Sequence, residues 1–192
     1  MLLAGAFGRT SAGRQASRCR RGTALTLLRR RRRTIEGMQL AGSCFCGAVR
    51  FTVETRTPYP YRRCYCARCR KTAGGTGAAA NILAQASSLQ VTGADALTEY
   101  AAPDSTRSRF CSRCGSALYL TIDSVTDFVY PFASAIDTQL PEPPERVHVF
   151  TAEAPAWAKP PPTPNDLAVE RNTNESIEGW HRRKGLFEDD AG

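Results

Sequence analysis

The chain has 192 residues, 42% of them hydrophobic, and carries a formal net charge of +8. This length supports one ordinary hydrophobic core, and we do not expect a second full domain. A charge of this size is typical of a nucleic-acid-binding protein when it is spread over the folded part, so its position along the chain decides what it implies.

The positive charge is concentrated in residues 1–37. This stretch holds ten arginines and one acidic residue, Glu36, for a net charge of +9, so residues 38–192 carry 16 basic and 17 acidic residues, for a net charge of −1. The folded part therefore lacks a basic surface, and we expect it to bind no nucleic acid. The apolar run at residues 24–28 is too short for a signal peptide or a membrane span, so we expect no membrane partner.

Residues 1–37 are predicted to form a disordered, arginine-rich leader, because they hold too few apolar residues to build a core. Three interpretations stay open: the start is misassigned and Met38 is the true initiator, the leader is a mitochondrial or plastid transit peptide, or it is a real disordered arm. We expect a cytoplasmic protein, or a mitochondrial or plastid one if the leader is a transit peptide.

Short apolar segments broken by Gly, Pro and Asn follow Met38 and predict β-strands. In residues 48–54 the side chains of Val49, Phe51 and Val53 alternate with polar neighbours, which is typical of a strand with one buried face. Comparable segments are residues 88–91, 97–100, 117–122, 127–132 and 146–150. No segment repeats apolar residues at helical spacing over three turns, so we predict a mainly β domain over residues 38–158.

A proline-rich run follows this predicted domain. Residues 159–192 are therefore expected to form a proline-rich linker and a polar C-terminal tail, extended or weakly docked, in which Trp180 is one of few large apolar residues. We expect the tail to be solvated, as is His181 within it; a lid or a partner-binding segment is the alternative. Within the domain, we expect His148 to be a packed histidine and Trp157 to close the core.

Seven of the eight cysteines fall into three clusters. These clusters are Cys44-Phe45-Cys46-Gly47, Cys64-Tyr65-Cys66-Ala67-Arg68-Cys69 and Cys111-Ser112-Arg113-Cys114-Gly115. Both CxC and CxxC spacings aim two sulfurs at one ion, and Gly115 permits a tight turn beside the thiolates. A disulfide framework or unrelated buried thiols are the alternatives, but CxC disulfides are strained and no secretory signal is present. The sequence therefore predicts zinc binding.

Seven ligands divide naturally into a closed site of four and an open site of three. Two distant chelating pairs are expected to form one structural zinc site: Cys44, Cys46, Cys111 and Cys114. A local triplet is expected to hold a second zinc with one position vacant: Cys64, Cys66 and Cys69. The alternative, a second closed site completed by Cys19, requires the leader to dock, and nothing in its sequence provides for that.

In this order, the motifs resemble those of the glutathione-dependent formaldehyde-activating enzymes, a family that shares its domain with centromere protein V. The resemblance covers about residues 38–158 and rests on four segments: residues 42–51, 64–71 and 109–118, and His148-Val149-Phe150 followed by Ala154-Pro155-Ala156-Trp157. It implies a zinc-stabilised β-tent fold, a single domain with flexible tails, two zinc ions per chain and the division of cysteines given above. Many members have histidine where this chain has Tyr65, a departure that bears on substrate preference.

The resemblance also implies an activity, that of a carbon–sulfur lyase of the S-(hydroxymethyl)glutathione synthase type, which serves formaldehyde detoxification. A glutathione thiol would fill the open position of the second zinc as a thiolate and add to the carbonyl carbon of formaldehyde. The implied partners are glutathione or another small thiol, and formaldehyde or another small aldehyde. Arg70 and Lys71 are candidates to pair with a glutathione carboxylate; ordinary surface charges are the alternative.

Three weaker interpretations stay open. The protein could bind the thiol or its adduct while the addition itself is spontaneous. It could be a non-enzymatic, zinc-stabilised binding module of the centromere protein V kind, whose basic leader contacts nucleic acid or microtubules. It could also be a redox protein that uses its cysteines as dithiols.

Overall fold

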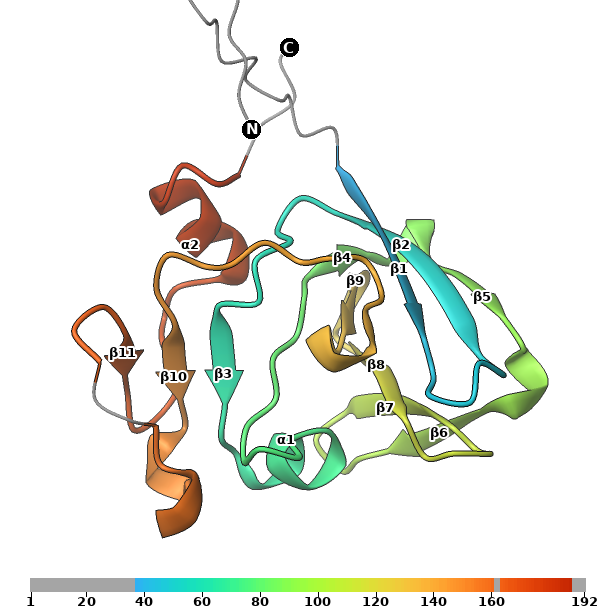
Figure 1. Ribbon diagram of the computed structural model, residues 1–192, viewed down its shortest axis with the longest axis horizontal. Helices are drawn as coiled ribbons and strands as arrows, with labels where there is room; N and C mark the ends of the chain where they lie inside the picture. The colour runs from blue at the N-terminus through green and yellow to red at the C-terminus, as the bar shows by residue number, and fades with distance from the viewer. Residues whose placement is uncertain (1–36, 161–162, 188–192) are drawn as a thin grey trace, which may run out of the picture. The chain divides into compact units, whose positions relative to one another are not determined.

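Three small β-sheets and two short α-helices make up the part of the chain that the computed structural model describes, residues 37–160 and 163–187 (Figure 1). These residues belong to one compact unit, residues 34–192. The prediction of a mainly β single domain is confirmed. The predicted leader up to residue 36, with Cys19, lies outside the described residues.

The first sheet is antiparallel, with the strand order β1-β2-β5. Its strands are β1 (Met38–Ser43), β2 (Arg50–Thr55) and β5 (Gln90–Thr92). Leu40 lies opposite Val53, and both side chains are buried while their neighbours along each strand are more exposed. This is the period-two pattern of a strand with one face in the core. The turn between β1 and β2 carries the first cysteine pair.

The second sheet is antiparallel and has the order β4-β9-β8-β7-β6. Its strands are β4 (Ala84–Gln85), β6 (Leu97–Ala101), β7 (Thr106–Cys111), β8 (Ala117–Ile122) and β9 (Val125–Pro131). Strand β7 was not predicted from the sequence, because its buried positions include Thr106 and Ser108 rather than large apolar residues. On its other face, Arg107 and Arg109 form ion pairs with Glu99 of β6.

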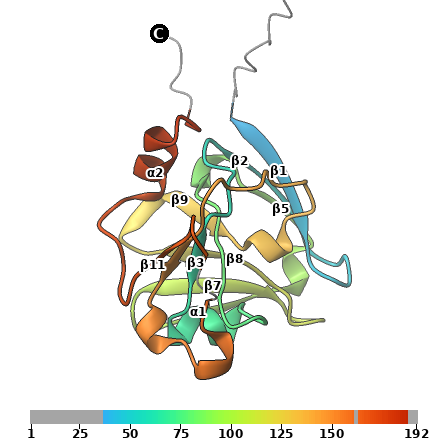
Figure 2. The same cartoon turned by 60° about the vertical axis from the view of Figure 1, so that its left-hand side comes forward.

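The third sheet is parallel and links distant parts of the chain. Its order is β11-β10-β3, and its strands are β3 (Arg62–Cys64), β10 (Val147–Val149) and β11 (Leu167–Ala168). Helix α1 (Ala67–Thr72) follows β3, and α2 (Ile177–Arg183) lies at the opposite end of this sheet (Figures 1 and 2).

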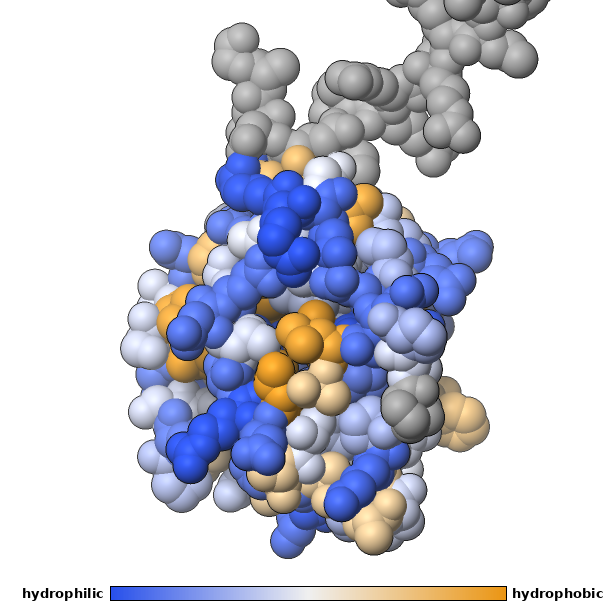
Figure 3. Space-filling view, turned by 90° about the vertical axis from the view of Figure 1, so that its left-hand side faces the viewer, coloured by the Kyte–Doolittle hydropathy of each residue, from blue (hydrophilic) through white to orange (hydrophobic). Residues whose placement is uncertain are grey.

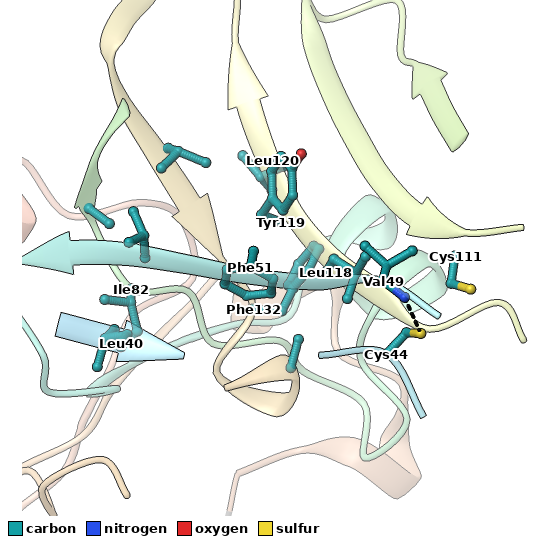
Figure 4. Close-up of a cluster of buried hydrophobic side chains, with 14 of the residues drawn as sticks. Leu40, Cys44, Val49, Phe51, Ile82, Cys111, Leu118, Tyr119, Leu120 and Phe132 are labelled. Carbon is teal, nitrogen blue, oxygen red and sulfur yellow. Dashed lines mark hydrogen bonds between the residues drawn. The ribbon is translucent and has the colours of Figure 1, made fainter. Parts of the chain in front are cut away.

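The main core lies between the first two sheets and ends at cysteine side chains. Figure 4 shows this cluster of buried side chains, with Cys44 and Cys111 at one end of it. Its large apolar members include Leu40, Val49, Phe51, Ile82, Leu118 and Phe132. A ligand shared by the two cysteine turns would therefore close the core at that end.

The C-terminal segment, residues 163–187, packs on the domain. The indole of Trp180 stacks on the ring of Tyr61, with 3.8 Å between ring centroids and 4° between planes, and its Nε1 donates to Glu145 Oε1 at 2.7 Å. Trp180 and His181 are fully buried. The expectation of a solvated His181 and a solvated tail is therefore wrong for these residues, because α2 is too short to show helical periodicity and its aromatic partner is distant in sequence.

Trp157 also differs from expectation, since 70% of its surface is exposed and it does not close the core. It lies in one of several short 3-10 helices: Ala86–Ser88, Ala94–Ala96, Ala133–Ala135, Thr151–Glu153 and Ala156–Ala158. The face that carries β10, β11 and α2 is mostly hydrophilic, with a small group of apolar residues in a hollow near its middle (Figure 3). Within the described residues, none of the helices has the length and apolar character to cross a membrane.

Candidate metal centres and the adjoining pocket

Four cysteines meet where the β1–β2 turn approaches the β7–β8 turn. The group consists of Cys44, Cys46, Cys111 and Cys114, and its sulfur atoms all lie within 4.8 Å of one another. The Sγ atom of Cys46 is 3.5 Å from that of Cys44 and 3.8 Å from that of Cys111. Sulfurs around a tetrahedral zinc, with zinc–sulfur bonds of about 2.3 Å, are separated by about 3.8 Å. The four sulfurs therefore fit a closed zinc site, and their separation is far above a disulfide bond length.

Each turn needs a glycine directly after its second cysteine. Gly47 and Gly115 have φ angles of 72° and 74°, in the left-handed region that side chains disfavour. Their amide groups donate to the carbonyls of Cys44 and Cys111 at 2.9 and 2.8 Å. The amide of Val49 donates to Cys44 Sγ at 3.2 Å, a contact that stabilises a thiolate.

The exposed end of this group also favours thiolate. Hydrogen bonds from the hydroxyl and backbone of Ser116 lower the pKa of Cys114 to about 5. The Ser116 hydroxyl also accepts from the amide of Phe45 at 3.1 Å, which links the two turns. The Ser116 side chain thus both connects the two turns and stabilises the Cys114 thiolate.

The remaining three cysteines form a second group at the start of α1. The Sγ atoms of Cys64, Cys66 and Cys69 lie within 4.8 Å of one another, and those of Cys64 and Cys66 are 3.4 Å apart. Cys64 ends β3, Cys66 caps α1, and Cys69 lies on the first turn of the helix. The cap is a hydrogen bond from the Cys69 amide to Cys66 Sγ at 3.4 Å. Among the described residues, this group includes no fourth Cys, His, Asp or Glu ligand.

The three thiols share their protons unequally. Hydrogen bonds from Cys64 and Cys69 lower the pKa of Cys66, whereas the contacts with Cys66 and Cys69 raise the pKa of Cys64. A divalent ion that binds soft sulfur ligands would stabilise the fully deprotonated set, which is the state that zinc requires.

A pocket of about 230 Å³ adjoins the three-cysteine group. Its lining residues are Arg62, Cys64, Arg68, Cys69, Ala79, Asn81, Leu120, Ile122, Tyr130, Val149, Phe150, Asn172 and Ile177. This volume is below the roughly 300 Å³ at which pockets for whole drug-sized ligands begin. The pocket can therefore admit a small molecule or one end of a larger one.

Two arginines give the pocket positive charge. Arg62 donates to Asn172 Oδ1 and, at 3.1 Å, to Thr173 Oγ1, so the C-terminal segment holds its guanidinium in place. Arg68 pairs with Asp104. Neither arginine was predicted to belong to the site, although Arg62 stands two residues before Cys64 on the same strand and so shares its face.

The predicted carboxylate-binding residues, Arg70 and Lys71, lie on α1 directly after the last ligand. Neither lines the pocket described above. Lys71 is exposed and Arg70 is half-buried. Their role toward a substrate stays a prediction. His148 is buried, as expected for a packed histidine, and it is not part of either metal-ligand group.

A family model and a curated relative identify the family of this chain. A family model described as "Glutathione-dependent formaldehyde-activating enzyme" matches residues 39–153. A curated protein of Halomonas elongata, named "Putative glutathione-dependent formaldehyde-activating enzyme", is 47% identical over 156 residues, which is 79% of this chain and 99% of the relative. A crystal structure of a Rhodobacter sphaeroides protein is 30% identical with a TM-score of 0.45, covering 53% of this chain and 91% of that one. Because the family match spans more than half of the sequence, this chain belongs to the glutathione-dependent formaldehyde-activating enzyme family.

Proposed function

We propose that the protein is a zinc-dependent carbon–sulfur lyase of the S-(hydroxymethyl)glutathione synthase type, which joins the thiol of glutathione to formaldehyde or a related small aldehyde. The observation that carries this proposal is the unequal grouping of the cysteines. Four cysteines would close the coordination of one zinc, whereas three cysteines beside a pocket would leave one position of a second zinc open to a substrate. Family membership and the name of the 47% identical relative support formaldehyde activation.

Zinc fits the donor set of both groups. Cys44, Cys46, Cys111 and Cys114 would hold the structural ion, and Cys64, Cys66 and Cys69 the catalytic one. At the three-sulfur group, zinc would favour the thiolate form of an incoming thiol, so that a strong sulfur nucleophile is available near neutral pH.

The reaction needs no oxidant or reductant. The thiol loses its proton, its sulfur forms a bond to the carbonyl carbon, and the carbon–oxygen π pair moves to the oxygen, which takes up a proton. The protein's share is to bring the two reactants together beside the three cysteines and to keep competing water away from the buried side of the pocket.

The charges of the pocket suit a thiol that carries carboxylates, as glutathione does. Arg62 and Arg68 supply two guanidinium groups within the same lining as Cys64 and Cys69. Because the pocket is small, we propose that the cysteine side chain in the middle of glutathione enters it while the two ends of the tripeptide lie across its mouth. Arg70 and Lys71 remain candidates for a carboxylate outside the pocket.

Exchange spectroscopy by NMR tests this function with zinc-loaded protein, glutathione and isotope-labelled formaldehyde. We expect exchange between free formaldehyde and S-(hydroxymethyl)glutathione to be faster with the protein than without it. Cys66→Ser should remove that acceleration while the far-UV circular dichroism spectrum is retained. If the fully zinc-loaded protein exchanges label no faster than the protein-free solution, it is not a lyase of this type.

A further inference from the structure

Tyr65 lies between two cysteines of the three-cysteine group, and its side chain contacts His148 on β10. It is one residue from Cys64 and one from Cys66, it is buried, and it is not among the residues that line the pocket. Its hydroxyl is 2.9 Å from Nδ1 of His148. Its backbone amide also donates to the carbonyl of Val149 at 3.0 Å. The segment that carries the ligands is therefore tied to β10 by both backbone and side chain.

The other ring nitrogen of His148 faces a carboxylate. Its Nε2 is 3.6 Å from Asp166 Oδ2, and both side chains are nearly buried. That distance is beyond a hydrogen bond, and Nε2 has no hydrogen-bond partner among the described residues. Burial lowers the pKa of His148, which favours the neutral imidazole. With a carboxylate facing Nε2, the favoured tautomer carries its proton there, and Nδ1 is then free to accept from the hydroxyl of Tyr65.

Asp166 is itself held in place. Its Oδ1 accepts from the amide of Arg146 at 2.9 Å. Hydrogen bonds from Thr163 and from this amide lower the pKa of Asp166, so it is a carboxylate at neutral pH. Asp166 stands directly before β11, so the polar chain reaches from the C-terminal segment through β10 to the metal-ligand segment.

We propose that Tyr65, His148 and Asp166 form a buried polar chain that positions Cys64 and Cys66 for the second metal ion. None of the three side chains lines the pocket, so they act through the ligands and not on a substrate. Outer partners that hydrogen-bond to metal ligands change metal affinity by roughly 10–100-fold when they are removed. Tyr65 would act on the ligands on either side of it through the backbone that it shares with them. The four-cysteine group takes no residue from this chain and serves as an internal reference.

Competition between the full-length protein and a chromophoric chelator tests the proposal, because it reports zinc affinity at both sites. Tyr65→Phe removes one hydroxyl and keeps the ring. We expect it to weaken the three-cysteine site by about 10–100-fold and to leave the four-cysteine site unchanged. Tyr119→Phe is the matched control, since Tyr119 is equally buried but packs against Phe51 in the main core. This control should bind both ions as the unchanged protein does.

Two further variants separate positioning from general packing. His148→Gln keeps an acceptor for the tyrosine hydroxyl and should retain most of the affinity that His148→Leu loses. Asp166→Asn, which keeps the volume but removes the charge, should weaken the same site. With cobalt in place of zinc, the thiolate charge-transfer bands of the three-cysteine site should change in Tyr65→Phe.

Equal affinity of Tyr65→Phe and unchanged protein for both ions would overturn the proposal, as would an equal loss at the two sites. The experiment uses neither glutathione nor aldehyde. Its result is therefore independent of whether the protein catalyses the proposed reaction.

Discussion

Cys66 combines two roles in one sulfur atom. It caps α1 by accepting from the Cys69 amide, and it belongs to the three-cysteine group. Serine is a good helix cap but a poor ligand for zinc beside thiolates, so Cys66→Ser should keep the helix and lose the second ion. We expect one zinc ion per chain in this variant by metal analysis, with a thermal unfolding midpoint close to that of the unchanged protein.

Cys111 gives the contrasting result. It is fully buried at the end of the main core and ends β7. Cys111→Ser would remove a ligand from the structural zinc that we propose joins the two sheets, and structural zinc sites contribute free energies of folding on the order of 10 kcal/mol. We expect this variant to be largely unfolded by circular dichroism. A folded Cys111→Ser protein that still holds two ions would contradict the structural role of the four-cysteine group.

A substitution at Arg62 tests whether this residue contributes to glutathione binding. Arg62→Gln removes a charge from the pocket, and a hydrogen bond to a charged group contributes about 1.5–3 kcal/mol, which corresponds to roughly 10–100-fold. If Arg62 contacts a carboxylate of glutathione throughout the reaction, KM for glutathione should rise by about that factor with kcat little changed. Arg107→Gln, which removes two exposed ion pairs of β7, is the control and should change neither constant. An unchanged KM in Arg62→Gln would place the carboxylate elsewhere.

The two cysteine groups could be predicted from the sequence because each close pair converges through local geometry. Two cysteines at CxC or CxxC spacing converge whatever the rest of the chain does, and a left-handed glycine after each of the two outer pairs reinforces the turn. The residues around the pocket could not be predicted in the same way. Asn172 reaches Arg62 across 110 residues of sequence, and no local pattern encodes that contact.

At the scale of elements, strands with one buried face were predictable and the helices were not. Residues 117–122 show the apolar run of β8, whereas β7 buries hydroxyl side chains and pairs its arginines with acids of its neighbours. Helix α2 spans seven residues, too few for an apolar period to repeat, and it docks through Trp180 on Tyr61. Tertiary contacts, and not local composition, therefore determine that β7 and α2 form.

Helix α2 should undock on acidification. Burial alone would raise the pKa of Glu145, but hydrogen bonds from Lys184 and Trp180 outweigh burial, so the pKa of Glu145 is lowered. Burial lowers the pKa of His181. A lowered pKa means that folding favours the deprotonated form of each group. The stability that they contribute is therefore present at neutral pH. It is lost as pH falls, first below the ordinary histidine value of 6.5 and then below the ordinary glutamate value of 4.5.

Fluorescence of Trp180 measures this transition in a Trp157→Phe variant, since the chain has two tryptophans. We expect the emission to shift to longer wavelength on acidification before circular dichroism reports loss of the sheets. Glu145→Gln should bring the shift to higher pH. Emission that changes only together with global unfolding would show that α2 does not undock separately.

At the scale of the whole molecule, the two cysteine groups lie in different parts of the fold and are expected to have different roles. The four-cysteine group lies where the β1–β2 turn meets the β7–β8 turn, so an ion held there would close the main core. The three-cysteine group lies beside a pocket to which the third sheet and the C-terminal segment contribute. The cysteines of both groups lie in residues 38–192, which carry a net charge of −1. Partial chelation should therefore remove the second ion first and leave the domain folded.

Zinc-edge X-ray absorption, combined with metal analysis, tests the unequal pair of sites most directly. We predict two zinc ions per chain with a mean sulfur coordination between three and four in the free protein. Adding glutathione should raise that mean to four, because its thiol completes the three-cysteine site. Two ions with four sulfurs each before glutathione is added, or a single ion per chain, would contradict the proposal of one closed and one open zinc site.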